Sequence, residues 1–286
     1  MAKGRELKGR IKSVENTRKI TRTMEMVATS KMKRATDRVA AARPYAMALG
    51  DMLGQLYTPE LAQQFPLLRR PVQPKKVALL LLTANRGLCG AFNANLIKEA
   101  RARMNEWEAR GIAVEMHIVG KKGIGYFRYL GKDIAAQRTD ITDKPTAADA
   151  ASLVDGLMTR FASGELDAVY VTGTKYKSAL TAPPATDAVL PVTPPTGAGV
   201  TRDFLLAPSG EEILEALLPA YVRNAVYRAL AETEAGFQSA QRTAMKNATD
   251  NATDMLQVLK RTYNTARQAQ ITQEIAEIVG GAAALS

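Results

Sequence analysis

The feature that most constrains this chain is a stretch of 59 residues, Tyr221 to Val279, that contains no proline and one glycine, Gly236. Small or apolar side chains recur along it at alternating steps of three and four residues, which is typical of a helix that packs along one side. At a rise of 1.5 Å per residue, such a helix is about 90 Å long. Because ordinary helices have ~10–14 residues, this one requires a partner helix or other chains to cover its apolar stripe.

A second helix of this kind is predicted at the other end of the chain. Fifteen small or apolar residues from Leu7 to Leu56 follow one another at a mean step of 3.5, the period of a left-handed coiled coil. Pro44 falls inside this pattern and is expected to kink the helix without ending it, since the pattern resumes at once. Thr58-Pro59 and the prolines that follow end it.

The character of the sequence changes at Lys76. Val77–Leu82 is a continuous apolar run, which indicates a strand buried on both faces of a parallel sheet. Helical and strand patterns then alternate, and Thr146 with Asp149 forms a capping box that opens one of the helices. This alternation predicts a doubly wound α/β domain over residues 76–195. The expected strands are 77–82, 114–119, 133–137, 167–172 and 188–192, and the expected helices are 93–109, 120–130 and 147–162.

The predicted fold is therefore α/β, with a long antiparallel coiled coil of the N- and C-terminal helices plus a doubly wound, Rossmann-like domain. Residues 1–57 form the first helix, 76–195 the α/β domain and 209–286 the second helix, which Ser209 and Glu212 cap. Both terminal segments share the 3.5-residue period, so the simplest arrangement pairs them with each other, with Ala28 near Ala252.

Charge is concentrated at the N-terminus. Residues 1–43 hold thirteen Lys and Arg and four acids, which leaves +9 of the chain's net +11. The acids and the long periodicity argue against a mitochondrial transit peptide. Three interpretations remain: a solvated helix face, a nucleic-acid stripe, or a surface that steers and contacts acidic segments of protein partners. Nucleic acid is disfavoured because no aromatic residue lies among these cations before Tyr45.

The single cysteine, Cys89, and the single histidine, His117, exclude an internal disulfide and a Cys/His zinc site. No apolar run reaches the ~18–20 residues that cross a bilayer. No pair of carboxylates stands out as an acid/base couple, so the sequence predicts no catalytic residues, metal ligands or cofactor site.

Three glycine-containing motifs need separate explanations. Gly4–Ile11 resembles a phosphate loop, but Arg10 and Ile11 replace its Lys and Ser/Thr, and no strand precedes it. Gly120–Gly125 follows a strand and is either a tight turn, which we favour, or an anion site at a helix N-terminus. Arg86–Gly90 contains Cys89, which we interpret as a packed turn residue and not as a nucleophile.

Four separated blocks resemble the γ subunit of rotary F-type ATP synthases. They are Ile11–Met32, Asn85–Gly90, Ala244–Asn251 and Ala266–Ala284, and the resemblance extends over essentially the whole chain. It implies a central rotor shaft of paired helices inside a hexamer of three α and three β subunits. The ε subunit and a membrane ring of c subunits would lie below. Proton-driven rotation of the ring would then turn the shaft. The turning shaft would force each catalytic site of the hexamer through different affinities in turn, and this chain would carry no catalytic residues of its own.

The resemblance also implies roles for individual residues. Met24 lies in the N-terminal shaft contact, Arg267 and Gln268 match the catch that bonds a β-subunit loop, and Thr272 and Glu274 continue that face. Cations expected to meet acidic segments of the hexamer are Arg10, Lys19, Arg22, Lys31, Lys33 and Arg34. The foot that contacts the c-ring corresponds to Asp203, Phe204, Leu205 and Leu206, and Ala207 stands where the family often has an acid.

The resemblance further implies a bacterial protein that lies peripherally on the cytoplasmic side of the inner membrane. No nucleic acid and no small-molecule substrate is expected. Two other functions remain open: a nucleic-acid-binding helical protein that uses the +9 segment, and a nucleotide-dependent enzyme that uses Gly120–Gly125. The apolar C-terminal end, Ile275 to Leu285, is expected to turn in a hydrophobic collar with few directional bonds.

Overall fold

A computed structural model describes residues 2–57, 64–193 and 209–284. The chain divides into two compact units, one made of residues 1–28 and 241–286 and the other of residues 29–240. Each unit is described by itself below. None of the helices in the described ranges carries a stretch long and apolar enough to cross a membrane.

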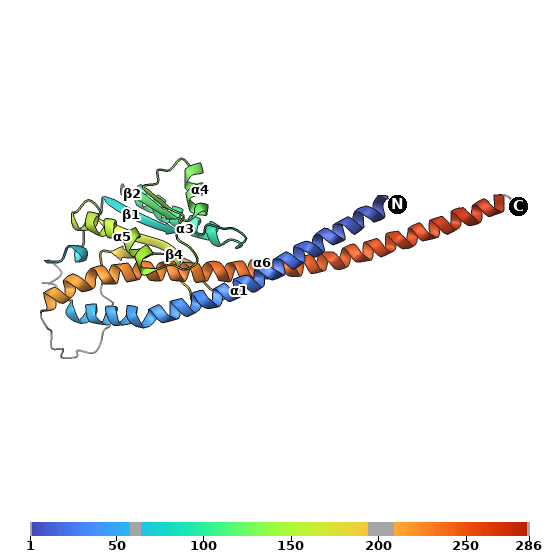
Figure 1. Ribbon diagram of the computed structural model, residues 1–286. Helices are drawn as coiled ribbons and strands as arrows, with labels where there is room; N and C mark the ends of the chain where they lie inside the picture. The colour runs from blue at the N-terminus through green and yellow to red at the C-terminus, as the bar shows by residue number, and fades with distance from the viewer. Residues whose placement is uncertain (1, 58–63, 194–208, 285–286) are drawn as a thin grey trace. The chain divides into compact units, whose positions relative to one another are not determined.

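Two long helices are the first and last elements of the chain, and parts of each belong to both units (Figure 1). Helix α1 spans Ala2–Leu56 and continues through Pro44, as the sequence predicts. Helix α6 spans Gly210–Ala284 and is 75 residues long, with Pro219 inside it. At its start the Ser209 hydroxyl accepts a hydrogen bond from the Glu212 N–H at 3.2 Å, which confirms the predicted cap.

The sheet of residues 29–240 has five strands in the order β3-β2-β1-β4-β5. Strands β1, β2, β3 and β4 are parallel, and β5 pairs antiparallel with β4 at the edge. Their bounds are β1 Lys76–Leu82, β2 Ala113–Val119, β3 Ala136–Arg138, β4 Ala168–Thr174 and β5 Pro184–Leu190. The helices between them are α3 Phe92–Ala109, α4 Lys121–Tyr129 and α5 Ala147–Ala162, and a short turn of 3-10 helix covers Pro66–Leu68.

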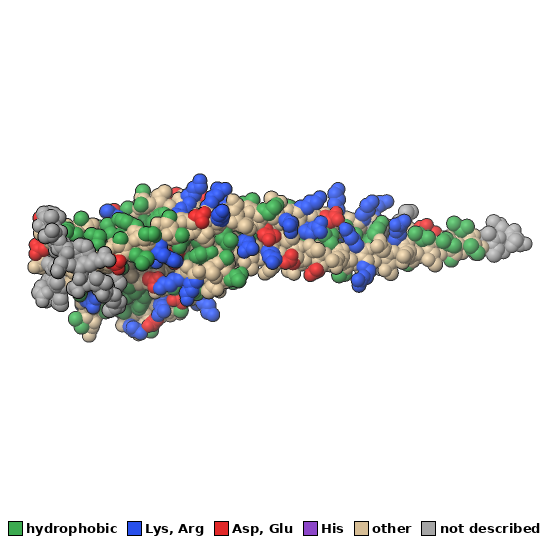
Figure 2. All heavy atoms as spheres, turned by 90° about the horizontal axis from the view of Figure 1, so that it is seen from below, with side chains coloured by type: hydrophobic (Ala, Val, Ile, Leu, Met, Phe, Trp, Pro, Cys, Tyr) green, Lys and Arg blue, Asp and Glu red, His purple; other side chains and the backbone are tan. Residues whose placement is uncertain are grey.

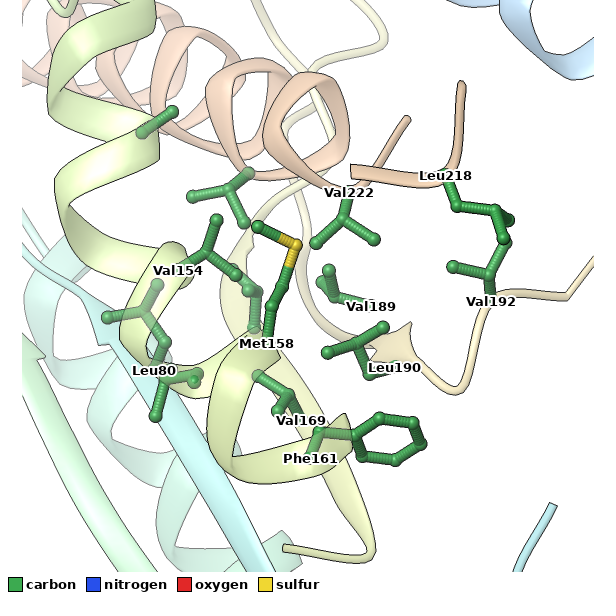
Figure 3. Close-up of a cluster of buried hydrophobic side chains, with 14 of the residues drawn as sticks. Leu80, Val154, Met158, Phe161, Val169, Val189, Leu190, Val192, Leu218 and Val222 are labelled. Carbon is green, nitrogen blue, oxygen red and sulfur yellow. The ribbon is translucent and has the colours of Figure 1, made fainter. Parts of the chain in front are cut away.

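Strand β1 separates two hydrophobic clusters, because its side chains alternate between the two faces of the sheet. Val77, Leu79 and Leu81 pack with α3 and α4. Leu80 and Leu82 pack with α5 and with the first part of α6, from Leu214 to Leu230. Figure 3 shows this second cluster, where Met158 of α5 lies between the sheet and Val222 of α6. Helices therefore cover both faces, which confirms the doubly wound fold.

Most predicted elements begin and end within a few residues of the observed ones. The Thr146 capping box is present, with the Thr146 hydroxyl accepting from Asp149 N–H and the Asp149 carboxylate accepting from Thr146 N–H. The last strand differs: it was expected at 188–192 but starts at Pro184. A proline is tolerated as the first residue of an edge strand, because that position has no ladder bond to donate on its open side.

Candidate functional site

The seam between α1 and α6 within residues 1–28 and 241–286 is made of small and hydroxyl side chains. Thr249 Oγ1 lies 2.8 Å from Thr21 Oγ1, and both side chains are buried. The Thr21 hydroxyl in turn donates to the Arg18 carbonyl at 3.1 Å. Because Thr249 donates to Thr21 and Thr21 donates to a backbone carbonyl, the two polar side chains can occupy a buried seam without leaving a donor unpaired.

A second contact gives the relative orientation of the two helices. Lys260 Nζ lies 3.5 Å from Glu15 Oε1. Glu15 precedes Thr21 in α1 and Lys260 follows Thr249 in α6, so the two helices run in opposite directions. Ala28, Ala252 and Leu256 are also buried. The two helices are therefore antiparallel here, as expected for a coiled coil of the termini.

Counting along the antiparallel pair from Thr21 and Thr249 gives its register. Seven residues further along α1, Ala28 faces the stretch near residue 242 of α6 and not Ala252. The expected pairing of Ala28 with Ala252 is therefore wrong by about three seam positions. Since the seam repeats every 3.5 residues, the sequence pattern looks the same after such a shift.

Within residues 29–240 the two helices meet through a separate small-residue cluster. Ala35 and Val39 of α1 pack with Ala231 and Ala235 of α6, and Tyr176 covers them. Alanines at these positions allow the two helix backbones to approach closely.

A basic groove lies along the helix pair of residues 1–28 and 241–286. Its walls are Arg18, Lys19, Arg22 and Thr23 of α1 together with Thr249 and Thr253 of α6, and its volume is about 650 Å³. Figure 2 shows Lys and Arg side chains along the helices on the face turned to the viewer. None of the groove-lining side chains is acidic, so the groove presents a concave positive surface to an anionic partner.

The glycine motif at the start of α4 forms a packed turn. The first three N–H groups of the helix, on Lys121, Lys122 and Gly123, donate to Asn85 Oδ1, the Ala84 carbonyl and Thr83 Oγ1. A Cβ atom added to Gly120 would lie 2.1 Å from the Thr83 carbonyl oxygen. The glycines thus permit a close approach of α4 to the chain after β1, and the groups that could hold a phosphate are already bonded within the protein.

The crevice in which doubly wound sheets usually bind ligands lies at the carboxyl ends of the strands, where the strand order reverses. In this sheet that point lies between β1 and β4. Helix α6 packs on the carboxyl end of β4: Thr174 N–H donates to Thr233 Oγ1 and Thr174 Oγ1 donates to the Glu232 carbonyl, both at 3.1 Å. A Cβ atom on Gly173 would lie 2.5 Å from Thr233 Oγ1. The protein's own helix therefore fills the end of β4.

Cys89 is buried in the turn before α3, as predicted for a packed turn residue. Its Sγ lies 3.2 Å from Asn93 Nδ2, and burial raises the pKa of the thiol. A raised pKa keeps the sulfur protonated and unreactive at neutral pH. His117, on β2, is hydrogen-bonded to Glu115 at 2.9 Å.

Two charge clusters could not be found from the sequence. Glu115 of β2 accepts two hydrogen bonds from Arg160 of α5, at 2.6 and 2.8 Å, and lies 3.2 Å from Lys76 Nζ. The Arg160 hydrogen bonds hold the pKa of Glu115 well below its usual value. The second cluster joins Lys31 and Arg38 of α1 to Asp143, whose carboxylate lies 2.8 Å from Lys31 Nζ and whose carbonyl accepts a hydrogen bond from Arg38 Nη1. Both depend on residues far apart in the sequence, and neither contains a recognisable spacing. Among the described residues, no group of three or more His, Cys, Asp and Glu side chains is arranged to hold a metal ion.

The sequence profile of the ATP synthase family matches residues 3–285. The ATP synthase gamma chain of Gemmatimonas aurantiaca is 77% identical over 288 residues, covering 100% of this chain and 99% of that relative. The gamma chain of Leptospira biflexa is 44% identical and matches over the full length of both chains. The chain belongs to the ATP synthase gamma chain family.

Solved structures agree with this assignment at the level of the fold. A chain in the Euglena gracilis mitochondrial ATP synthase OSCP/F1/c-ring structure superposes with a TM-score of 0.70 at 20% identity, over 99% of this chain and 95% of that chain. A chain in the central stalk/c-ring structure of Tetrahymena thermophila mitochondrial ATP synthase gives 0.63 at 25% identity, over 80% and 99% of the two chains. The fold of this ATP synthase gamma chain family member is thus that of central-stalk proteins.

The cations expected to face partner subunits fall into two groups. In residues 1–28, Lys19 and Arg22 are exposed in the basic groove, and Arg10 pairs with Glu6 at 3.1 Å on the same helix. In residues 29–240, Lys33 and Arg34 are exposed. Lys31, in contrast, lies 2.8 Å from Asp143 Oδ2, so this ammonium already has a partner within the chain. Met24 is half-buried.

The expected catch residues lie on the C-terminal part of α6. Arg267, Gln268, Thr272 and Glu274 are all exposed, and Gln270 Nε2 donates to Glu274 Oε1 at 2.8 Å. Apolar side chains further along, Ile275, Ile278 and Val279, are also exposed. The expected foot residues, Asp203, Phe204, Leu205 and Leu206, lie outside the described residues.

Proposed function

We propose that this chain is the central rotor shaft of an F-type ATP synthase and that it couples proton-driven rotation of a c-ring to the catalytic cycle of an α/β hexamer. The observation that carries the proposal is the antiparallel pair of terminal helices in a chain of the ATP synthase gamma chain family. Residues 1–57 and 209–286 would act as the shaft, with residues 76–195 as the attached domain.

The packing of the helix pair is suited to transmitting torque. Within residues 1–28 and 241–286 the buried Thr21–Thr249 pair holds the register, and within residues 29–240 small residues such as Ala35 and Ala235 bring the helices close. Two helices in close contact resist twisting better than a single helix, because rotation of one against the other would have to break the seam.

The α/β domain has no chemical role in this proposal. Its candidate nucleotide motif, Gly120–Gly125, has its helix-terminal N–H groups bonded to Thr83, Ala84 and Asn85, and α6 fills the end of β4. These contacts favour a structural domain over the nucleotide-dependent enzyme. Nucleotide chemistry would then belong to the partner subunits.

The partners that we propose are three α and three β subunits, one ε subunit and the c-ring, at the cytoplasmic face of the inner membrane. The basic groove of Arg18, Lys19 and Arg22 and the cations Arg10, Lys33 and Arg34 would meet acidic segments of the hexamer, whereas Lys31, also expected there, is held by Asp143 within the chain. Met24 would lie in the shaft contact, and Asp203, Phe204, Leu205 and Leu206 would form the foot on the c-ring.

Co-purification tests the assembly directly. A tagged chain expressed in its own cells should bring down nucleotide-binding subunits in a three-to-three ratio around one copy. Recovery of the chain without such subunits, or with nucleic acid that survives a wash at 0.15 M salt, would contradict the proposal.

The catch is tested in the assembled complex. Replacing Arg267 and Gln268 by alanine should lower ATP hydrolysis and ATP-driven proton pumping together by about tenfold, if the two side chains contribute hydrogen bonds worth about 1.4 kcal/mol to the coupled step. Arg261→Ala, an exposed cation on the same helix, is the matched control and should leave both rates near wild type. Equal loss in the two variants would rule out a specific catch.

The collar is tested by truncation. Deleting residues 276–286 should leave ATP hydrolysis largely intact, because the exposed apolar side chains Ile278 and Val279 would make contacts without directional bonds. Complete loss of assembly or of hydrolysis would count against a collar in which this end turns freely.

A further inference from the structure

A groove lies between helix α5 and the outer strands β2 and β3, and we call it the edge groove. Its volume is about 320 Å³. Ser152, Gly156 and Arg160 line it from α5, and because they are four residues apart they lie on one face of that helix. The edge groove belongs to the unit of residues 29–240 and is separate from the basic groove of the helix pair.

Two hydrogen-bonded bridges between α5 and the sheet mark the ends of the edge groove. At one end, Arg138 Nη1 of β3 donates to Ser152 Oγ at 3.0 Å. At the other end, Arg160 donates to both carboxylate oxygens of Glu115 on β2, at 2.6 and 2.8 Å. Ser152 and Arg160 are eight residues apart, which corresponds to about 12 Å along a helix. The bridges therefore hold α5 over the strands and leave a slot between them.

Gly156 lies midway between the two bridges, and the packing of α5 does not require a glycine there. A Cβ atom added to Gly156 would meet no heavy atom within 4 Å. Glycine in the interior of a helix is destabilising relative to alanine, so this glycine weakens α5 without serving a close contact. On the strand side the groove is lined by another small residue, Ala136 of β3. The two walls thus leave a flat space at the middle of the groove.

The remaining lining combines apolar side chains with hydrogen-bond donors. The apolar part includes Leu80, Leu153 and Leu157. Among the donors, the Arg138 guanidinium is held in place by Asp140, which accepts from Nε and Nη2, and by Ser152. These bonds use three of its five N–H groups, so the guanidinium retains donors for a further acceptor.

The charges around the edge groove favour an uncharged ligand. None of the described residues that line it is acidic, but its cations face carboxylates close by. The cations are Lys76, Arg138 and Arg160, and the carboxylates are those of Glu115, Asp140, Asp149 and Glu165. An anion would therefore lose hydration without a net attraction, whereas a neutral acceptor can use the remaining N–H groups of Arg138 at little cost.

We propose that the edge groove binds a small, flat, uncharged heteroaromatic molecule that carries a hydrogen-bond acceptor, such as a ring with a carboxamide group. The ring would lie against the leucines beside Gly156, and its acceptor would face Arg138. Apolar walls with a few placed polar groups are typical of small-molecule sites. The proposal concerns residues 29–240 alone and does not depend on the proposed rotor function.

The single histidine of the chain allows a direct test, because His117 lines the edge groove. Proton NMR of the full-length chain, purified without a histidine tag, follows the carbon-bound protons of this imidazole during titration with nicotinamide. The signal should shift and saturate with a Kd on the order of 1–10 mM, as expected for so small a ligand. Nicotinate has the same shape but an ionised carboxylate at neutral pH, and it should bind about tenfold more weakly. No saturable shift with nicotinamide, or equal affinity for nicotinate, would overturn the proposal.

Three variants locate the binding. Gly156→Leu should fill the groove and weaken nicotinamide binding by more than about tenfold while α5 stays folded, since leucine favours a helix and the added Cβ meets open space. Gly125→Leu, at an exposed glycine of α4 that also has open space beside it, is the matched control and should bind like the wild type. Arg138→Met should weaken binding by about fivefold, the loss of one hydrogen bond.

Unchanged affinity in Gly156→Leu, or an equal loss in Gly125→Leu, would show that nicotinamide does not bind in the edge groove. Unchanged affinity in Arg138→Met would contradict the placement of the acceptor.

Discussion

The sheet of residues 29–240 and the helix pair of residues 1–28 and 241–286 are both closely packed, but with different side chains. Strand β1 places six consecutive fully buried residues, Val77–Leu82, between helices on its two faces. The helix pair instead buries threonines and alanines, such as Thr21, Ala28 and Thr249. Large aliphatic side chains gain more free energy on burial, while small ones allow closer backbones.

The ion pairs of the two regions also differ, in how much of their side chains is exposed to solvent. Glu115 in the sheet is bonded to Arg160, Lys76 and His117 in a half-buried network. In the helix pair, the Glu15–Lys260 contact is a single pair whose side chains are 38% and 58% exposed. A difference of this kind suggests that the domain supplies stability, whereas the helix pair supplies stiffness and a defined register.

The largest effect is expected in the sheet. Leu80→Ala removes a fully buried side chain between β1 and α5, and it should lower the free energy of unfolding of the sheet by about 3–5 kcal/mol. Native-state hydrogen exchange of the β1 amides measures this loss. Val72→Ala, at a position that is 97% exposed, is the control. A loss below about 1 kcal/mol for Leu80→Ala would contradict the packing described for this face.

A smaller effect, with a defined pH dependence, is expected from the charge network. Because the pKa of Glu115 is depressed in the folded chain, its stabilisation is present above about pH 4.5 and is lost as the pH falls below that value. Glu115→Gln should cost about 2–3 kcal/mol at pH 7 and flatten the fall in stability at acidic pH. Urea unfolding monitored between pH 3 and 7 measures both.

The control for this prediction comes from the other region. Glu15→Gln in the helix pair should change the free energy of unfolding by less than about 1 kcal/mol at pH 7, because its pair is exposed to solvent. If the two substitutions had equal effects, the contrast between a half-buried network and a surface pair would not hold.

The smallest effect is expected in the seam of the helix pair. Thr249→Val removes the hydroxyl that bonds Thr21 and should destabilise the pairing by about 1 kcal/mol, since the shape of the side chain is kept. Thr253→Val removes a hydroxyl that donates to the Thr249 carbonyl in its own helix and should change little. Protection of α1 amides near Thr21 reports the pairing, and indistinguishable protection in the two variants would argue against a role for the buried hydroxyl pair.

Local patterns were sufficient to predict most of the fold. The apolar run Val77–Leu82 gave strand β1, the Thr146 capping box gave the start of α5, and the 3.5-residue period gave both terminal helices. Each of these signals lies within a few residues of the element that it predicts. The edge strand β5 was less accurate because its start at Pro184 depends on pairing with β4.

Features that depend on distant residues could not be predicted. The seam pattern is periodic, so it fixed the pairing of α1 with α6 but not the register that joins Thr21 to Thr249. The contact of Lys31 with Asp143 brings together two segments far apart in the chain. The packing of α6 on the carboxyl end of β4 likewise follows from tertiary structure alone.

The central claim is that the beginning and the end of this chain lie side by side in one antiparallel register. The most direct test is a disulfide cross-link between Thr21→Cys and Thr249→Cys in a chain that also carries Cys89→Ser. The hydroxyl oxygens of the two threonines are 2.8 Å apart, so the two sulfur atoms would lie within bonding reach. Mild oxidation of the purified chain should form an intramolecular disulfide in nearly every molecule, whereas the Ala28→Cys and Ala252→Cys pair should remain reduced. Free thiols in the first variant, or cross-linking only in the second, would show that the helices do not pair as described.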